Sequence, residues 1–162
     1  NEVNTMKIIL LIGKICCGKS TYARSLKGTL LISCDQLMQS MFPGGCGEHH
    51  DLLAERARKY LLQLARQCAE AGVTPVVDFG FWNPSTRREA IDALVGFELD
   101  WRWIDVEEAE WNRRIDKRNA AILAGQADPS DYYVDAGLRE KVERLFIPPT
   151  PEELPGLQII RG

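Results

Sequence analysis

The stretch Gly13-Lys14-Ile15-Cys16-Cys17-Gly18-Lys19-Ser20 decides how this chain is expected to fold. It matches the pattern G-x-x-x-x-G-K-S/T, in which backbone N–H groups and the positive end of a helix dipole surround phosphate oxygens. The apolar run 6–12 before it is typical of a strand buried in a parallel sheet, and a helical segment begins near Lys19. We therefore expect residues 13–20, together with Thr21, to bind the phosphates of ATP.

Four residues of this loop have chemistry of their own. Lys19 is placed to reach the β- and γ-phosphates, and the Ser20 hydroxyl is placed to ligate Mg²⁺. Cys16 and Cys17 stand where such loops commonly have small residues. Two interpretations stay open: the cysteines are tolerated as small side chains, or a thiol beside Lys19 and a helix N-terminus has a lowered pKa and is sensitive to oxidation.

The rest of the chain alternates between short apolar runs and segments with helical periodicity. This alternation predicts an α/β fold around a parallel sheet, here read as a single domain over residues 1–162. Further strands are expected at 29–33, 74–79, 97–104 and 157–160. Helices are expected at 19–27, 35–42, 51–71, 84–95, 107–118 and 135–146.

Local signals indicate where some of these helices begin. Asp51 is a candidate N-cap for the long helix, and Asn83 followed by Pro84 is an N-cap with a first-turn proline. Residues 43–47, rich in glycine, and residues 119–133, which include Gly125 and Pro129, lack clear periodicity. Both segments are predicted to be loops.

Three acidic residues lie near the ends of predicted strands or directly after them, where open α/β sheets bind their ligands. Asp35 is a candidate general base for an attacking hydroxyl, and it is also a candidate helix N-cap. Asp78 is a candidate ligand of Mg²⁺ or of the substrate. For Asp105 we favour helix capping over chemistry.

Arginines gather at the end of the helix predicted over 107–118. Acids at its start and bases at its end suit the helix dipole, which by itself accounts for their charge. We favour a second interpretation, in which Arg114 and Arg118 belong to a lid around 114–133 and close over the transferring phosphoryl group.

Composition sets limits on partners and location. The 162 residues carry 20 Lys plus Arg and 23 Asp plus Glu, a net charge of −3 that argues against tight, purely electrostatic binding to duplex nucleic acid. No apolar run reaches membrane-spanning length, and no secretory signal precedes the first strand. The five cysteines show no metal-binding spacing, so we expect a cytoplasmic protein with free thiols.

These motifs together resemble the small P-loop kinases of the AAA-type ATP-binding family, which are grouped with the 5′-kinase domain of phage polynucleotide kinase. The resemblance covers most of the chain and implies an adenylate-kinase-like sandwich of three layers with a five-stranded parallel sheet. It rests on the stretches 6–10, 18–24, 33–40, Asp78 with 83–88, and 114–118.

The resemblance also implies roles for single residues. Asp35 matches the general base, and Lys19 and Ser20 match the residues that hold ATP and Mg²⁺. Arg118 matches a lid arginine that stabilises the transition state, and Arg114 lies on the same lid. Asp78 and Arg87 are then expected near the substrate or the metal.

One position departs from the family pattern. Where the polynucleotide kinase has a phosphate-binding arginine three residues after the catalytic acid, this chain has Met38. We therefore expect ATP- and Mg²⁺-dependent phosphorylation of a small hydroxylated acceptor. The alternatives are a polynucleotide 5′-hydroxyl kinase and a nucleotide-binding regulator without acceptor chemistry; the oligomeric state is left open.

Overall fold

A parallel sheet forms the centre of the molecule. The computed structural model describes residues 6–128 and 131–162. Its strands are β1 (Lys7–Ile12), β2 (Thr29–Ser33), β3 (Thr74–Gly80), β4 (Glu98–Asp105) and β5 (Gln158–Arg161). They form a five-stranded sheet in the order β2-β3-β1-β4-β5, and every neighbouring pair is parallel. The predicted α/β class and the five-stranded sheet are confirmed.

Strand β1 lies at the middle of this sheet because its residues are apolar on both faces. It pairs with β3 on one side and with β4 on the other, with Leu10 opposite Val77 and Trp101. Side chains of residues 8–12 are all buried. A strand that is paired along both edges and covered on both faces must be apolar throughout, which is what the run 6–12 predicts.

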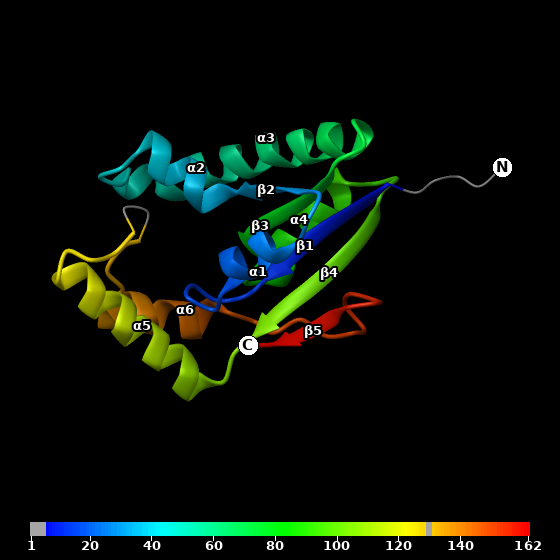
Figure 1. Cartoon of the computed structure of the whole chain (residues 1–162). Helices are drawn as coiled ribbons and strands as arrows, with labels where there is room; N and C mark the ends of the chain where they lie inside the picture. The colour runs from blue at the N-terminus through cyan, green and yellow to red at the C-terminus, as the bar shows by residue number, and fades with distance from the viewer. Residues whose placement is uncertain (1–5, 129–130) are drawn as a thin grey trace.

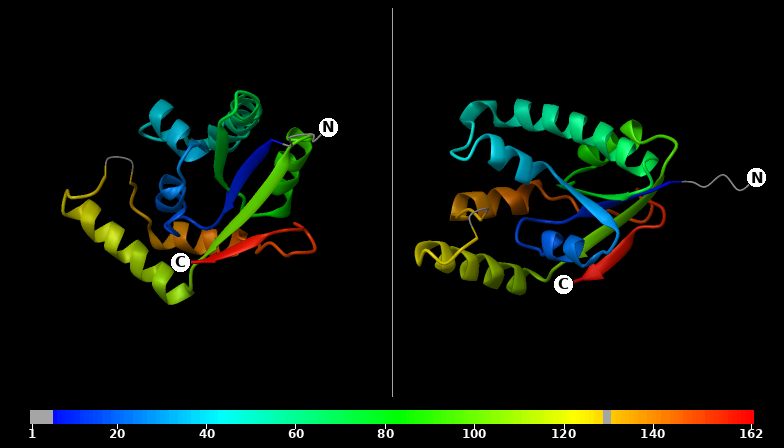
Figure 2. Two further views of the ribbon diagram at one scale, coloured as in Figure 1. Left: turned by 45° about the vertical axis from the view of Figure 1, so that its right-hand side comes forward. Right: turned by 45° about the horizontal axis from the view of Figure 1, so that its top comes forward.

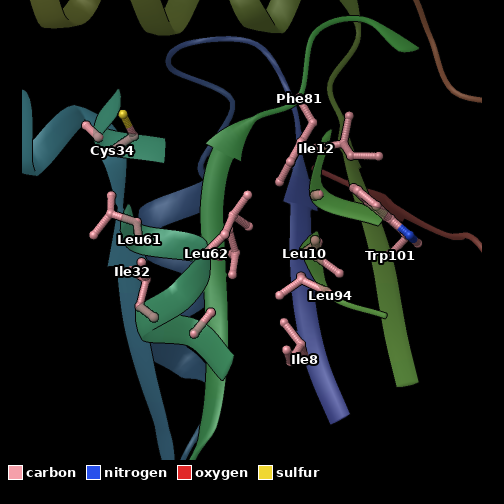
Figure 3. Packing of buried hydrophobic residues seen from close by; sticks show 14 of the residues in the cluster. Ile8, Leu10, Ile12, Ile32, Cys34, Leu61, Leu62, Phe81, Leu94 and Trp101 are labelled. Carbon is pink, nitrogen blue, oxygen red and sulfur yellow. The ribbon is translucent and has the colours of Figure 1, made fainter. Parts of the chain in front are cut away.

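Helices cover both faces of the sheet and extend past one end of it (Figure 1). On one face, Ile8, Leu10 and Ile12 belong to a core with Leu62 of α3 (His50–Glu70) and with Leu94, which directly follows α4 (Pro84–Ala93) (Figure 3). On the other face, Ile9 and Leu11 pack with Ala23 of α1 (Lys19–Ser25). The result is the predicted arrangement of three layers.

Three further helices surround the carboxyl ends of the strands. They are α2 (Cys34–Met41), α5 (Glu108–Leu123) and α6 (Ala136–Leu145). All the views place α5 and α6 together at this end of the sheet (Figures 1 and 2), and Arg139 of α6 bonds Asn112 and Asp116 of α5. The space enclosed by these helices is where ligands of open α/β sheets bind.

Two predicted boundaries are wrong. A short 3₁₀ helix, η1 (Gly47–His49), leads directly into α3, and His50 already has helical dihedral angles. The helix therefore begins before Asp51, which lies in its first turn and is not its N-cap. By contrast, the cap at Asn83 is confirmed, because its side chain accepts a hydrogen bond of 2.9 Å from the N–H of Thr86.

The second wrong boundary is the end of α5, which continues to Leu123 instead of stopping at Arg118. The added turn is held by Asn119, whose buried amide both donates to and accepts from the backbone of Val134, each time at 2.8 Å. Of the described residues in the predicted loop 119–133, only 124–128 and 131–133 lie outside a helix, and Pro129 lies outside the described residues. In 6–128 and 131–162, no helix combines the length and the apolar character needed to cross a bilayer.

Candidate functional site

The loop between β1 and α1 adopts a tight curve with unusual backbone angles. Cys16 and Gly18 have positive φ values of 58° and 94°. Glycine tolerates this region, but an L-residue such as Cys16 is strained there by about 1–2 kcal/mol. Gly13 is required for another reason, because a Cβ atom there would lie 2.5 Å from the Sγ of buried Cys17.

Lys19 folds back over this loop. Its Nζ donates to the carbonyl oxygens of Gly13 at 3.1 Å and Lys14 at 2.8 Å. Burial acts to lower the pKa of Lys19, but Cys17 and the carboxyl groups of Asp78 and Asp35 outweigh burial, so its pKa lies above the usual value. The amine is therefore a fixed positive charge at neutral pH.

A cavity of about 300 Å³ opens beside Lys19. It brings together most of the residues predicted from the sequence: Ile15, Cys16, Cys17, Gly18, Lys19, Ser20, Thr21, Asp35, Asp78 and Arg118. They come from the loop, α1, the start of α2, β3 and α5, which are distant in sequence. The carboxyl ends of β1 and β3 and the flanking helices thus converge on one space, as the parallel sheet predicts.

Asp35 lies in the first turn of α2 but does not cap it. The N-cap is Ser33, whose side chain accepts from the N–H of Gln36 at 3.2 Å. The alternative role of Asp35 as a helix cap is therefore wrong. Its carboxylate lines the cavity instead.

Asp78 reaches the same cavity from β3, and only 8% of its surface is exposed. Burial raises the pKa of Asp78, Lys19 partly opposes the rise, and Asp35 adds to it. A buried carboxylate beside a second carboxylate is stabilised by a bound cation.

The oxygen donors here fit Mg²⁺. Ser20 and Asp78 supply a hydroxyl and a carboxylate, and Mg²⁺ in phosphate-binding sites takes one or two such protein ligands together with phosphate oxygens and water. Within residues 6–128 and 131–162, no cluster of three or more His, Cys, Asp or Glu residues is built to hold a metal by itself. The donor set therefore suits a metal that arrives with a phosphate ligand.

The two arginines predicted to belong to a lid lie in different places. Arg118 lines the cavity and pairs with Asp131 at 3.7 Å. Arg114 lies outside the cavity, where it donates to the carbonyl of Cys17 at 3.0 Å and pairs with Glu110. Arg114 thus contacts the loop from its outer side.

Arg87 is not brought to the cavity, which corrects its expected place near the substrate. Its side chain is fully buried and donates to the carbonyls of Phe81 and Ile147 and to the carboxylate of Glu153. Glu153 lies 66 residues further along the chain, so no local pattern indicates this pairing. Lys14 also turns away, with its Nζ 4.6 Å from the ring centroid of Trp111.

The Cys16 thiol does not have the lowered pKa expected of a reactive cysteine. Burial raises the pKa of Cys16, although Arg118 and Lys19 act in the opposite direction. Cys17 is buried, with its Sγ 3.8 Å from the Nζ of Lys19. Both observations favour the interpretation that these cysteines serve as small side chains.

Several residues of the cavity were not predicted. They are Arg24, Ser33, Gln36, Gln39, Asp128, Asp131 and Tyr132. Gln36 and Gln39 are three residues apart on one helix and follow Asp35, a spacing that indicates a shared face. Tyr132, whose pKa burial and Asp35 raise to about 12, carries no such signal in the sequence.

Solved structures similar to this chain show the fold. A gluconokinase from Sinorhizobium meliloti 1021 is 17% identical with a TM-score of 0.60, and the match covers 97% of this chain and 83% of that one. The APS kinase CysC of Mycobacterium tuberculosis, in complex with AMPPNP and APS, has the same identity and TM-score over 97% of this chain and 88% of its own. A chain of the Pnkp1/Rnl/Hen1 complex is 17% identical with a TM-score of 0.60, over 70% of this chain.

The present chain spans only 40% of that Pnkp1/Rnl/Hen1 component. Among curated proteins, none matches significantly. Residues 8–133 match the AAA domain family, a range that takes in β1, the phosphate loop, Asp35, Asp78 and Arg118. Because this match covers more than half of the chain, the protein belongs to the AAA domain family and has the P-loop NTPase fold shared with the gluconokinase and the APS kinase.

Proposed function

We propose that this protein is an ATP- and Mg²⁺-dependent phosphotransferase that moves the γ-phosphoryl group to the hydroxyl of a small-molecule acceptor. The observation that carries the proposal is the single cavity shared by Lys19, Ser20, Asp35, Asp78 and Arg118. A protein that only binds nucleotide needs the first two of these residues. A carboxylate and an arginine facing the same space add the groups that phosphoryl transfer requires.

Each residue has a distinct task in this proposal. Asp35 accepts the proton of the attacking hydroxyl, while Lys19 and Arg118 stabilise the charge on the transferring phosphoryl group. Ser20 and Asp78 are the residues that hold Mg²⁺, which when bound neutralises phosphate charge. Arg118 releases Asp131 as it turns to the phosphate, so the ion pair of 3.7 Å is replaced by a stronger contact.

A second cavity accounts for the rest of the nucleotide. It has a volume of about 610 Å³ and lies between the loop, α5 and the end of β5. Its lining includes Thr21, Tyr22, Ile104 and Arg114, and it shares Cys16–Gly18 with the first cavity. We place the nucleoside here, which leaves the side of the first cavity formed by Asp35, Gln36 and Gln39 to the acceptor.

Two observations favour a small acceptor over a polynucleotide. Met38 is only 6% exposed and belongs to the core, and Arg87 is fully buried and paired. Neither position offers a cation to a nucleic-acid phosphate. The acceptor side contains Asp35, whose carboxylate repels a polyanion.

The test compares acceptors with Mg²⁺ and ATP labelled on its γ-phosphate. One reaction contains a 5′-hydroxyl oligonucleotide, and the other contains a panel of small polyols, sugars and amino alcohols. The proposal predicts label on a member of the small-molecule panel and none on the oligonucleotide. Label on the oligonucleotide alone would replace it with the polynucleotide kinase, and ATP binding without transfer to any acceptor would replace it with the regulator.

A further inference from the structure

Three side chains outside the cavity hold alternate carbonyl groups of the phosphate loop. The indole Nε1 of Trp82 donates to the carbonyl of Gly13 at 3.1 Å. The indole Nε1 of Trp111 donates to the carbonyl of Ile15 at 2.7 Å. The guanidinium of Arg114 donates to the carbonyl of Cys17 at 3.0 Å.

The spacing of these contacts fixes the direction of the intervening N–H groups. In a planar trans peptide, the C=O of one residue and the N–H of the next point in opposite directions. Holding the carbonyls of residues 13, 15 and 17 outward therefore turns the N–H groups of Lys14, Cys16 and Gly18 the other way. Cys16 and Gly18 line the cavity.

The backbone N–H groups that point away from the three held carbonyls have no hydrogen-bond acceptor within the described residues. Across residues 6–128 and 131–162, the backbone N–H groups of Lys14, Cys16 and Gly18 donate to no protein acceptor. A row of N–H groups pointing in one direction is a site for phosphate oxygens. The positive φ of Cys16, which strains the chain, is compatible with this row and is maintained by the contacts on either side of it.

Each indole is itself fixed by its surroundings. Trp111 is 1% exposed and packs with Ile15, Ile115 and Val142, so its N–H has no solvent to bond instead. Trp82 follows β3, and its own carbonyl accepts from the N–H of Ile147 at 2.7 Å. Gly80 leaves room for it, because a Cβ atom there would lie 2.9 Å from the indole nitrogen.

Lys19 shares one of these acceptors. Its Nζ bonds the carbonyl of Gly13 together with Trp82. When Lys19 turns toward phosphates, this carbonyl loses one donor and keeps the other. Trp82 therefore holds the start of the loop in the state in which nucleotide is bound.

We infer that Trp82 and Trp111 are positioning residues for the nucleotide: their N–H groups hold the phosphate loop in the shape that receives the β-phosphate, although neither touches the nucleotide. This inference rests on the nucleotide binding within the proposed function and is independent of the acceptor. The two tryptophans lie 29 positions apart in the sequence. In this inference they act together to hold the shape of the phosphate loop.

The test replaces the N–H and keeps an aromatic ring, with Trp82→Phe and Trp111→Phe in the full chain. The matched control is Trp101→Phe, since Trp101 is 4% exposed, packs edge-on against Phe81 and, within the described part of the chain, makes no hydrogen bond to the loop. Binding of ADP and of AMP is measured by calorimetry in the presence of Mg²⁺, and unfolding midpoints are measured in urea. Each loop variant should bind ADP about fivefold to tenfold more weakly than the wild type, with AMP affinity within about twofold.

The ratio of ADP to AMP affinity separates positioning from simple loss of stability, because AMP has no β-phosphate. ADP affinity within twofold of the wild type in both loop variants would overturn the inference, and so would an equal loss in Trp101→Phe. If Trp111→Phe does not fold, Trp82→Phe decides, since that indole is only half-buried. A wild-type protein that binds no ADP would refute the nucleotide site as a whole, whereas ADP binding without phosphoryl transfer would leave the inference standing.

Discussion

The phosphate loop and the segment after α5 line the same cavity, but they are held by different kinds of contact. The loop joins a strand buried at the centre of the sheet to a helix, and Trp82, Trp111 and Arg114 bond its carbonyl groups. The described residues between α5 and α6 are held by the bonds of Asn119 to Val134, by packing of Val134 with Ile15 and Trp111, and by the ion pair between Arg118 and Asp131.

Under the proposed function, the two sides of the cavity have different tasks. Phosphate binding is the same for every reaction of such an enzyme, so a loop fixed in advance loses little entropy when the nucleotide binds. In that proposal the acceptor side admits and releases a substrate, which requires contacts such as the ion pair between Arg118 and Asp131 to break. A lid over 114–133 stays a prediction, but 114–123 belong to α5, whose Ile115 packs with Ile15 of the loop.

The largest expected effect is the loss of activity on replacing Lys19, for which Lys14 of the same loop is the control. Lys19→Ala removes the amine that faces the cavity, and kcat/KM for ATP should fall by about 10³-fold. Lys14→Ala removes an amine that lies over Trp111, outside this cavity, so kcat/KM should stay within about threefold. Steady-state kinetics with the acceptor found in the screen measures both. Equal losses in the two variants would mean that the loop responds to charge as a whole and not to the position of Lys19.

A smaller effect is expected when the acceptor side is loosened. Asn119→Ala breaks two buried hydrogen bonds to Val134 and should lower the free energy of unfolding by about 2 kcal/mol. Hydrogen exchange should show lost protection at the Val134 amide, and the KM for the acceptor should rise while ADP affinity stays unchanged. The control is Asn112→Ala on the same helix, whose half-buried side chain bonds Arg139 of α6 and not Val134. An ADP affinity that falls together with acceptor affinity would contradict the separation of the two sides.

The smallest expected effect is the change in thermal stability when Asp78 is replaced. This residue lies between the phosphate-binding side and the acceptor side of the cavity. Because its pKa is raised by burial, the folded protein binds this proton more tightly than the unfolded chain does, and the free energy of unfolding falls as pH rises above 3.8. Asp78→Asn removes the free-energy cost of burying a charged carboxylate. The nucleotide-free protein should therefore melt about 2–4 °C higher at pH 8. This gain should shrink toward pH 4, where the wild-type carboxyl is also protonated.

The same substitution should impair Mg²⁺-dependent transfer. Thermal unfolding at the two pH values and kinetic assays at neutral pH check the pair of effects. A melting temperature that falls at pH 8 would show that the attraction to Lys19 exceeds the penalty of burial.

Local patterns in the sequence were sufficient for much of this structure. The run 6–12 predicts the central strand, because burial on both faces demands apolar residues throughout. Asn83 with Pro84 predicts the start of α4, because capping depends on neighbours within one turn. The loop, Asp35 after β2 and Asp78 near the end of β3 predict most of the cavity, since parallel strands present their carboxyl ends together.

Features that depend on distant partners were missed. Arg87 is drawn into the protein by Glu153 and by the Ile147 carbonyl, 60 or more residues away. The bonds from Trp82 and Trp111 to the loop likewise span 69 and 96 residues. Asn119 extends α5 by bonding a segment that returns to it from beyond the helix. No periodicity in the sequence encodes such pairings.

The proton acceptor is the part of the proposed chemistry that distinguishes a kinase from a nucleotide-binding protein. The most direct test therefore measures single-turnover transfer of labelled γ-phosphate to the small-molecule acceptor by the wild type, Asp35→Ala and Asp105→Ala. Asp105 also ends a strand but lies outside the cavity that contains Asp35, so its variant controls for loss of a strand-end carboxylate. We predict that Asp35→Ala binds ADP as tightly as the wild type and transfers phosphate about 10²- to 10⁴-fold more slowly, while Asp105→Ala transfers at the wild-type rate. Transfer by Asp35→Ala at the wild-type rate would contradict the proposed function.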